Sequence, residues 1–299
     1  MLRKVLVGVD GTSSARDAVV LARALAADGD PDVVLVGAYA DPLLPFPPGL
    51  RRELHLGQEV ERLLLDVREQ LAPTARTHVK ADRSPGRALC HELERERADL
   101  LVVGSSRRVD AGRAGAGRTG RQVLHGAACA VAVAAHGVAG AAPLALRRLV
   151  VGVERSPESD AALALARSLA EAAGAELLAV AVADDRLPAT VAPAGMAVEL
   201  VQWDEVVEAH RSAAERLLAE LTGRIPELSV ELRAGDPAEE LAAAAAGADL
   251  LVLGSRRWGP LARLVLGSTG QELVRDAPCS LLLVPRPAEE APTDSSVDH

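Results

Sequence analysis

Residues 98–108 read ADLLVVGSSRR and residues 248–258 read ADLLVLGSRRW, so the same stretch occurs twice, 150 positions apart. An earlier stretch also repeats: RKVLVGVD at 3–10 matches RRLVVGVE at 147–154, 144 positions apart. The difference between the two offsets indicates six extra residues in the second copy, within DDRLPATVAPAGM at 184–196. A period this long corresponds to whole domains rather than to the short units of a solenoid. The sequence therefore predicts two tandem copies of one domain.

The repeat divides the chain into four segments. We expect a first domain over residues 1–137, a linker over 138–146, a second domain over 147–286 and a tail over 287–299. The tail is polar and contains proline, a composition typical of disordered termini.

Each copy alternates strands with helices. Val5–Val9 and Leu149–Val153 are continuous apolar runs, which is typical of strands covered on both faces. The first helix is expected to open at the hydroxyl residues Ser13 and Ser14 in one copy and at Ser156 in the other. Further elements follow in both copies: long amphipathic helices over 50–71 and 197–222, fourth strands over 99–103 and 249–253, and last strands over 130–135 and 280–284. The pattern predicts an α/β fold in which a five-stranded parallel sheet carries helices on both faces.

Composition excludes several function classes. Aromatic residues make up only 1% of the 299 residues, which argues against a base-stacking surface for nucleic acid, and the net charge of -9 offers no general attraction for DNA or anionic lipid. The three cysteines show no metal-binding spacing, so no metal site is predicted. No stretch is long and apolar enough to span a membrane or to serve as a secretion signal. We expect a cytoplasmic protein without nucleic-acid or membrane partners.

A glycine-punctuated basic loop follows the fourth strand of the second copy. It leaves the strand at Gly254 and enters a helix at Gly267, Ser268 and Thr269, with Arg256, Arg257 and Arg263 supplying positive charge. N–H groups at a helix start, glycine and hydroxyl donors together favour an anion, most simply a nucleotide phosphate. In the alternative interpretation, Gly254 only ends a strand, Ser268 or Thr269 only caps a helix, and the arginines are solvated.

The first copy carries a variant of the same loop. Gly104 and Gly117 match, but Arg118 stands where the second copy has Ser268, and Arg107 lies nearby. A guanidinium can bind phosphate or can fill the pocket itself, and the sequence leaves both open.

The first strands end in carboxylates, Asp10 in one copy and Glu154 in the other. Each can accept hydrogen bonds from the nucleoside end of a ligand, or can serve as a turn or helix cap. Glu154 is one methylene longer, so it would need a shifted ligand or a different rotamer.

These motifs together resemble the universal stress protein family in its tandem form, over about residues 3–136 and 147–286. The resemblance implies two flavodoxin-like, nucleotide-hydrolase-like domains. It also implies ATP, with or without Mg²⁺, bound through G-x2-G-x9-G-[ST], with the strand-one aspartate near the adenine. This chain departs from the motif: Arg107 and Arg257 replace the middle glycines, Arg118 replaces the hydroxyl residue and Glu154 the aspartate. We expect the second half to keep the better binding site for the phosphates and the first half the better binding site for the adenine.

The leading hypothesis is a stress-response protein that binds an adenine nucleotide in at least one domain and acts as a nucleotide-responsive regulator rather than an enzyme. One alternative is a slow ATP hydrolase with His91, His125 or Asp10 as base, although no catalytic set can be assembled. The other is a nucleotide-independent scaffold with arginine-filled pockets and an unknown protein partner.

The last strands suggest how the copies join. Family resemblance implies pairing through these strands, here 130–135 against 280–285, as a pseudo-dimer within one chain. Homodimerisation is a further expectation.

Overall fold

The computed structural model describes residues 2–26, 31–40, 56–141, 143–186, 201–258 and 263–286. The first half holds β1 (Lys4–Val9), α1 (Ser13–Leu25), β2 (Asp32–Ala40), α2 (Leu56–Leu71), β3 (Arg76–Asp82), α3 (Pro85–Glu96), β4 (Leu100–Gly104), α4 (Arg118–Gly126) and β5 (Ala130–Ala134). After the short 3-10 helix η2 (Val138–Ala141), the second half holds β6 (Arg148–Gly152), α5 (Pro157–Ala173), β7 (Glu176–Ala183), α6 (Val201–Arg224), β8 (Ser229–Ala234), α7 (Pro237–Ala244), β9 (Leu250–Trp258), β10 (Arg263–Val265), α8 (Ser268–Leu273) and β11 (Ser280–Pro285).

The two halves have the same strand order. It is β3-β2-β1-β4-β5 in the first and β8-β7-β6-β9-β11 in the second, and all neighbours within each half are parallel. This confirms the predicted pair of five-stranded parallel sheets. In the first half, β2 and β3 lie on one side of β1, and β4 and β5 lie on the other. The second half repeats this arrangement around β6. Such a reversal of strand order opens a crevice beyond the carboxyl ends of the two strands that flank it, which are β1 and β4 in one half and β6 and β9 in the other.

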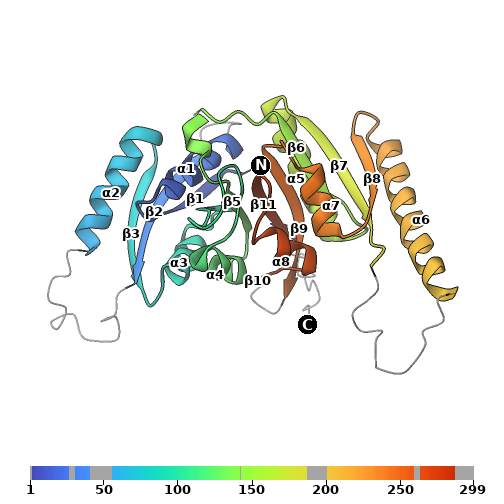
Figure 1. Ribbon diagram of the computed structural model, residues 1–299. Helices are drawn as coiled ribbons and strands as arrows, with labels where there is room; N and C mark the ends of the chain where they lie inside the picture. The colour runs from blue at the N-terminus through green and yellow to red at the C-terminus, as the bar shows by residue number, and fades with distance from the viewer. Residues whose placement is uncertain are drawn as a thin grey trace, which may run out of the picture.

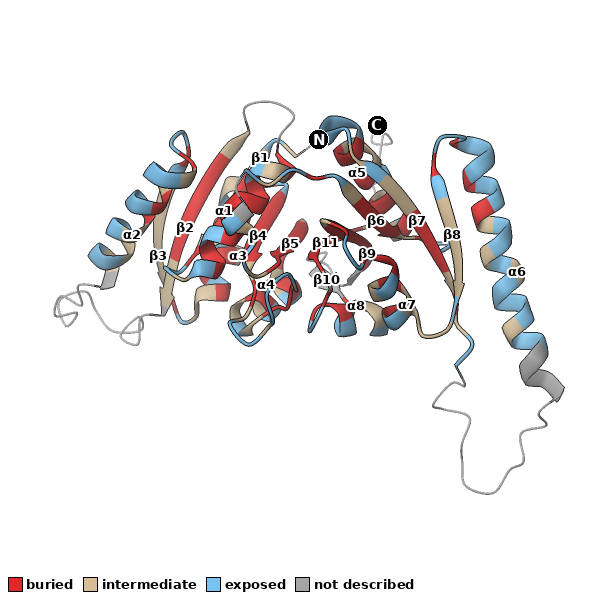
Figure 2. Cartoon of the chain, turned by 45° about the horizontal axis from the view of Figure 1, so that its top comes forward, coloured by how far each residue is buried: buried red, intermediate tan, exposed pale blue. Residues whose placement is uncertain are grey.

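Helices cover both faces of the sheet. One apolar core lies under α1, α2, α5 and α6, and the other under α3, α4, α7 and α8. Figure 2 shows the central strands largely buried and the outward faces of α2 and α6 exposed. Each core runs through both halves, because the two sheets are joined.

The joint is the pairing of the last strands. β11 pairs antiparallel with β5, with Leu281 opposite Val133 and Leu283 opposite Val131. The predicted pseudo-dimer within one chain is therefore confirmed, and Figure 1 shows β5 and β11 side by side at the centre of one continuous sheet. These strands are used inside the chain, so a homodimer would need another surface and stays a prediction.

Several local predictions differ from the structure. Thr12, not Ser13 or Ser14, caps α1, because its Oγ1 accepts the N–H of Ala15 at 3.3 Å. Residues 50–55 and 197–200 of the two predicted long helices lie outside the described residues, and within the described part the second of them ends at Arg224 rather than at 222.

The largest difference concerns the basic loop of the second copy. β9 does not end at residue 253 but continues to Trp258 and pairs antiparallel with β10, so part of the predicted loop is a hairpin.

Among the described residues, no helix is long and apolar enough to cross a membrane.

Candidate functional site

Two matching cavities open at the carboxyl ends of the strands. The first cavity, of about 300 Å³, lies between the ends of β1 and β4 and the starts of α1 and α4. The second cavity, of about 330 Å³, lies at the corresponding place in the other half, between β6, β9, α5 and α8. Both lie where a ligand of an open parallel sheet is expected.

The sequence-predicted residues gather around these cavities. Asp10, Gly104 and Gly117 line the first. The second is lined by Glu154, Gly254, Gly267, Ser268 and Thr269. The backbone of Arg257 lies in β9 opposite Leu264 of β10, an extended conformation that does not require glycine, and its side chain is outside the described part of the chain.

The helices that start at the cavities lack side-chain caps. α4 and α8 begin after Gly117 and Gly267, and neither N-cap residue makes a side-chain hydrogen bond to its helix. In contrast, Thr12, Ser84, Ser156 and Asp236 cap α1, α3, α5 and α7 with their side chains. Among the helices whose N-caps the structure describes, α4 and α8 are therefore the ones whose first-turn N–H groups are left for a ligand.

Glycine occurs at the motif positions for two different reasons. A Cβ on Gly104 would lie 2.1 Å from the carbonyl oxygen of Ser14, and one on Gly254 would lie 2.6 Å from the carbonyl carbon of Glu158. These two glycines let the first turn of α1 pack on β4 and that of α5 pack on β9. A Cβ on Gly117 would make only ordinary contacts, the nearest at 3.6 Å, and one on Gly267 would have no described atom within 4 Å. Packing does not demand glycine there, whereas a closely approaching ligand would.

The strand-one carboxylates share one arrangement. Asp10 Oδ1 accepts hydrogen bonds from the backbone N–H and the hydroxyl of Thr12, at 3.1 and 2.7 Å. Glu154 Oε1 accepts the hydroxyl of Ser156 at 3.1 Å. Each carboxylate thus steadies the N-cap residue two positions on, as the turn interpretation expected, while also lining its cavity.

The cavities differ in their cations. Arg107 and Arg118 line the first cavity, are exposed, and form no ion pair with the described residues. Arg186 lines the second, but it donates to both oxygens of Asp184 at 3.0 Å and also contacts Asp236. The hydrogen bond from Arg186 holds the pKa of Asp184 below its ordinary value. The charge of Arg186 is therefore already neutralised.

The lining residues that sequence reasoning missed include Ser14 in the first cavity, and Glu158, Asp184 and Arg186 in the second. Ser14 and Glu158 occupy the same position after the strand-one carboxylate, so aligning the copies could have found them. Arg186 and Asp236 are 50 residues apart, and no sequence signal joins them.

The histidines proposed as bases lie away from the cavities. His91, on α3, is 59% exposed and pairs with Asp82 at 3.0 Å. His125 lies in the last turn of α4, at the opposite end from the cavity. Of the three candidate bases, only Asp10 lines a cavity.

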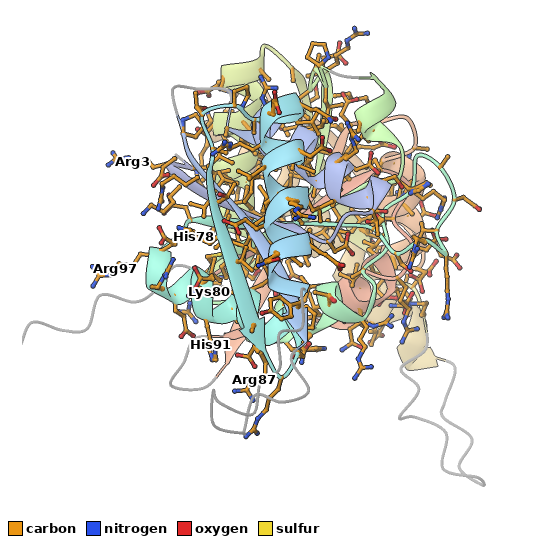
Figure 3. All side chains as sticks on the ribbon, turned by 90° about the vertical axis from the view of Figure 1, so that its left-hand side faces the viewer. Arg3, His78, Lys80, Arg87, His91 and Arg97 are labelled. Carbon is orange, nitrogen blue, oxygen red and sulfur yellow. The ribbon has the colours of Figure 1, made fainter. Side chains whose placement is uncertain are left out.

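One cluster within the described residues could by spacing hold a metal: His78, Glu92 and Glu96, whose ligand atoms lie within 4.8 Å of one another. Figure 3 shows His78 and Lys80 on the outer edge of the first half. Glu92 is nearly fully buried and pairs with Lys80 and Arg95, each at 2.7 Å. These cations already compensate its charge, so the cluster is better explained as an ion network than as a metal site.

Cys90, Cys129 and Cys279, all within the described residues, form no disulfide with one another. Cys279 is 3% exposed, and burial raises its pKa to about 12. It therefore behaves as a small core residue rather than as a nucleophile.

Comparison with known proteins agrees with this fold. The model of the universal stress protein family matches residues 1–135 and 145–285. A universal stress protein of Thermus aquaticus is 34% identical over 143 residues, covering 46% of this chain and 98% of that protein. One of Mycolicibacterium smegmatis is 27% identical over 293 residues, covering 94% and 96% of the two chains. The crystal structure of a universal stress protein from Archaeoglobus fulgidus superposes with a TM-score of 0.66 at 18% identity, covering 96% of this chain and all of that one.

Proposed function

The chain belongs to the universal stress protein family, and we propose that it binds an adenine nucleotide, ATP, in at least one of its two cavities and acts as a nucleotide-responsive regulator. The observation that carries the proposal is the pair of uncapped helix starts, Gly117 and Gly267, each open toward a cavity at the end of the sheet.

The chemistry of the lining supports a nucleotide rather than a simple anion. In the first cavity, the start of α4 and the hydroxyl of Thr119 offer donors for phosphate oxygens. Val36, Ala38 and Leu89 supply an apolar wall for a base. Asp10 lines the same cavity and can accept hydrogen bonds from the nucleoside. Mg²⁺, where present, would accompany the phosphates.

The two alternatives fit the structure less well. A hydrolase needs a base at the cavity, and of the three candidates only Asp10 lines one. Its Oδ1 already accepts two hydrogen bonds from Thr12. A scaffold with arginine-filled pockets needs guanidinium groups buried in them, but Arg107 and Arg118 are exposed at the first cavity.

Calorimetric titration with ATP, with and without Mg²⁺, tests the proposal. Arg118→Glu reverses a charge at the first cavity, and Arg121→Glu makes the same change on the exposed side of α4. Ser268→Glu places a negative charge at the second cavity, and Arg275→Gln, at an exposed position just after α8, is its control with the same change in net charge.

We expect wild type and both controls to bind ATP, and at least one of the two cavity variants to lose binding by about a hundredfold or more. Absence of binding by the wild type at millimolar ATP would contradict the proposal. Equal binding by all four variants would place the ligand elsewhere and would contradict it too.

A further inference from the structure

We propose that the two cavities are not equivalent: the first accepts the nucleotide phosphates with Ser14 as a direct contact, and the second rejects them because Glu158 stands at the matching position. This inference rests on the proposed function and adds which half binds and which residue decides it.

The two residues occupy one structural position. Ser14 is the fourth residue after Asp10, and Glu158 is the fourth after Glu154. Each lies in the first turn of the helix that follows the first strand of its half, and each lines its cavity. Each also packs on a glycine of the neighbouring strand, Gly104 at the end of β4 or Gly254 within β9, which fixes its backbone at the cavity wall.

Ser14 has an unmet hydrogen-bonding requirement. Its side chain is buried, with 3% of the residue exposed, and its Oγ has no partner among the described residues. Buried hydroxyls are normally paired, and an unpaired one is unfavourable unless a ligand or water supplies the partner. A phosphate oxygen in the first cavity would accept a hydrogen bond from this hydroxyl.

The charges of the lining side chains point the same way. In the first cavity, Arg107 and Arg118 outnumber the single carboxylate of Asp10. In the second cavity, the described lining holds three carboxylates, those of Glu154, Glu158 and Asp184, and one cation, Arg186. Arg186 already pairs with Asp184 and Asp236. A carboxylate at position 158 adds repulsion for a phosphate at a site without an unpaired described cation.

The backbone after the fourth strand also differs. Ser105, Ser106 and Arg107 turn at the rim of the first cavity. In the second half the corresponding backbone continues as β9 and pairs with β10, whose hairpin contacts α4 of the first half. The backbone of residues 256–258 is therefore held in a hairpin, whereas Arg107 lies in a turn.

Reciprocal exchange of the two residues tests the inference. Binding is measured with radiolabelled ATP by equilibrium dialysis, and the occupied half is located by photocrosslinking 8-azido-ATP and mapping the labelled peptides. Ser13→Glu is the control for Ser14→Glu, because Ser13 is the exposed neighbour and does not line the cavity. Asp160→Ser is the control for Glu158→Ser, since it removes an exposed acid from the same helix.

We expect wild type to bind in the first half only. Ser14→Ala breaks no described hydrogen bond of the fold and should weaken ATP binding about tenfold. Ser14→Glu should weaken it about a hundredfold or more. Glu158→Ser should create a second site with crosslinks in residues 147–286, while both controls behave as wild type.

Two results would overturn the inference while leaving the proposed function intact: equal labelling of both halves in the wild type, or unchanged affinity in Ser14→Ala. If no variant and no wild-type protein binds ATP at millimolar concentration, the proposed function and the inference fail together.

Discussion

Glycine serves two separate purposes in β4 and β9 and in the segments that lead from them to the next helix. Gly104 and Gly254 admit the backbone of α1 and α5, whereas Gly117 and Gly267 leave open space at the start of α4 and α8. The two kinds of glycine should therefore respond differently to the same substitution: the first kind through stability and the second through ligand binding.

Gly104→Ala should destabilise the fold by about 2 kcal/mol or more, because the added methyl overlaps backbone that belongs to a packed helix. Gly117→Ala should reduce stability by less than about 1 kcal/mol, since only the cap preference changes. Urea unfolding monitored by circular dichroism measures both. Equal losses in the two variants would contradict this division of roles.

Among the elements, α1 is tied to the linker between the halves by one buried carboxylate. Asp17 is 1% exposed, and its two oxygens accept the N–H groups of Gly137 and Ala139 at 2.9 and 2.8 Å. The equivalent position of the second half is Ala161, so alanine fits this helix surface.

Asp17→Ala should therefore reduce the free energy of unfolding by about 2 to 4 kcal/mol, through the loss of two charge-assisted hydrogen bonds rather than through a clash. The same denaturation assay applies, with exposed Ser13→Ala as the control within α1. A loss no larger than that of the control would show that Asp17 does not hold the linker.

The edge formed by β3 and α3 carries a pH-dependent network. Glu96 accepts a hydrogen bond from Arg76 at 2.9 Å, and this bond lowers the pKa of its carboxyl to about 2 from an ordinary 4.5. A pKa that is lower in the folded state stabilises the fold above the unfolded value, and this contribution is lost as the pH falls toward the folded value.

Glu96→Gln should therefore be less stable than wild type at pH 7, by at most about 1 kcal/mol because Arg76 is 44% exposed. The two stabilities should converge between pH 4.5 and pH 2. Thermal unfolding across this range measures the difference. A gap that is constant with pH would exclude a role for this titration.

At the scale of the whole molecule, the two halves are built as one body. Besides the pairing of β5 with β11, Ala114 and Ala277 exchange backbone hydrogen bonds of 2.9 and 2.7 Å across the joint. Arg113 and Asp276 add an ion pair at 2.5 Å. The loop that borders the first cavity is thereby attached to the second half.

This construction predicts cooperative unfolding. Leu281→Ala, in buried β11, should cost about 2 to 4 kcal/mol and should lower amide protection in β4 and β5 of the first half as well as in β9. Hydrogen exchange measured by mass spectrometry resolves the strands. Faster exchange confined to the second half would contradict a single cooperative unit.

The repeat made the architecture predictable, while local geometry was less so. The duplicated strand-one and strand-four motifs predicted two parallel sheets, and the family resemblance implied the pairing of their last strands. The hairpin after Gly254 was missed because antiparallel pairing depends on a partner strand that the basic loop sequence does not reveal. The cap at Thr12 was placed one residue late, a usual limit for helix ends. Ser14 was read as a cap because burial without a partner is not visible in sequence.

The central claim is that this chain holds an adenine nucleotide, and the most direct measurement is the nucleotide content of the protein itself. Protein purified quickly without added nucleotide is denatured in acid, and released adenylates are quantified by ion-pair chromatography beside Arg118→Glu and Arg121→Glu. The account predicts ATP in near-stoichiometric amount from the wild type and from Arg121→Glu, and little from Arg118→Glu. Absence of adenylate from the wild type, together with no binding at millimolar ATP, would contradict it.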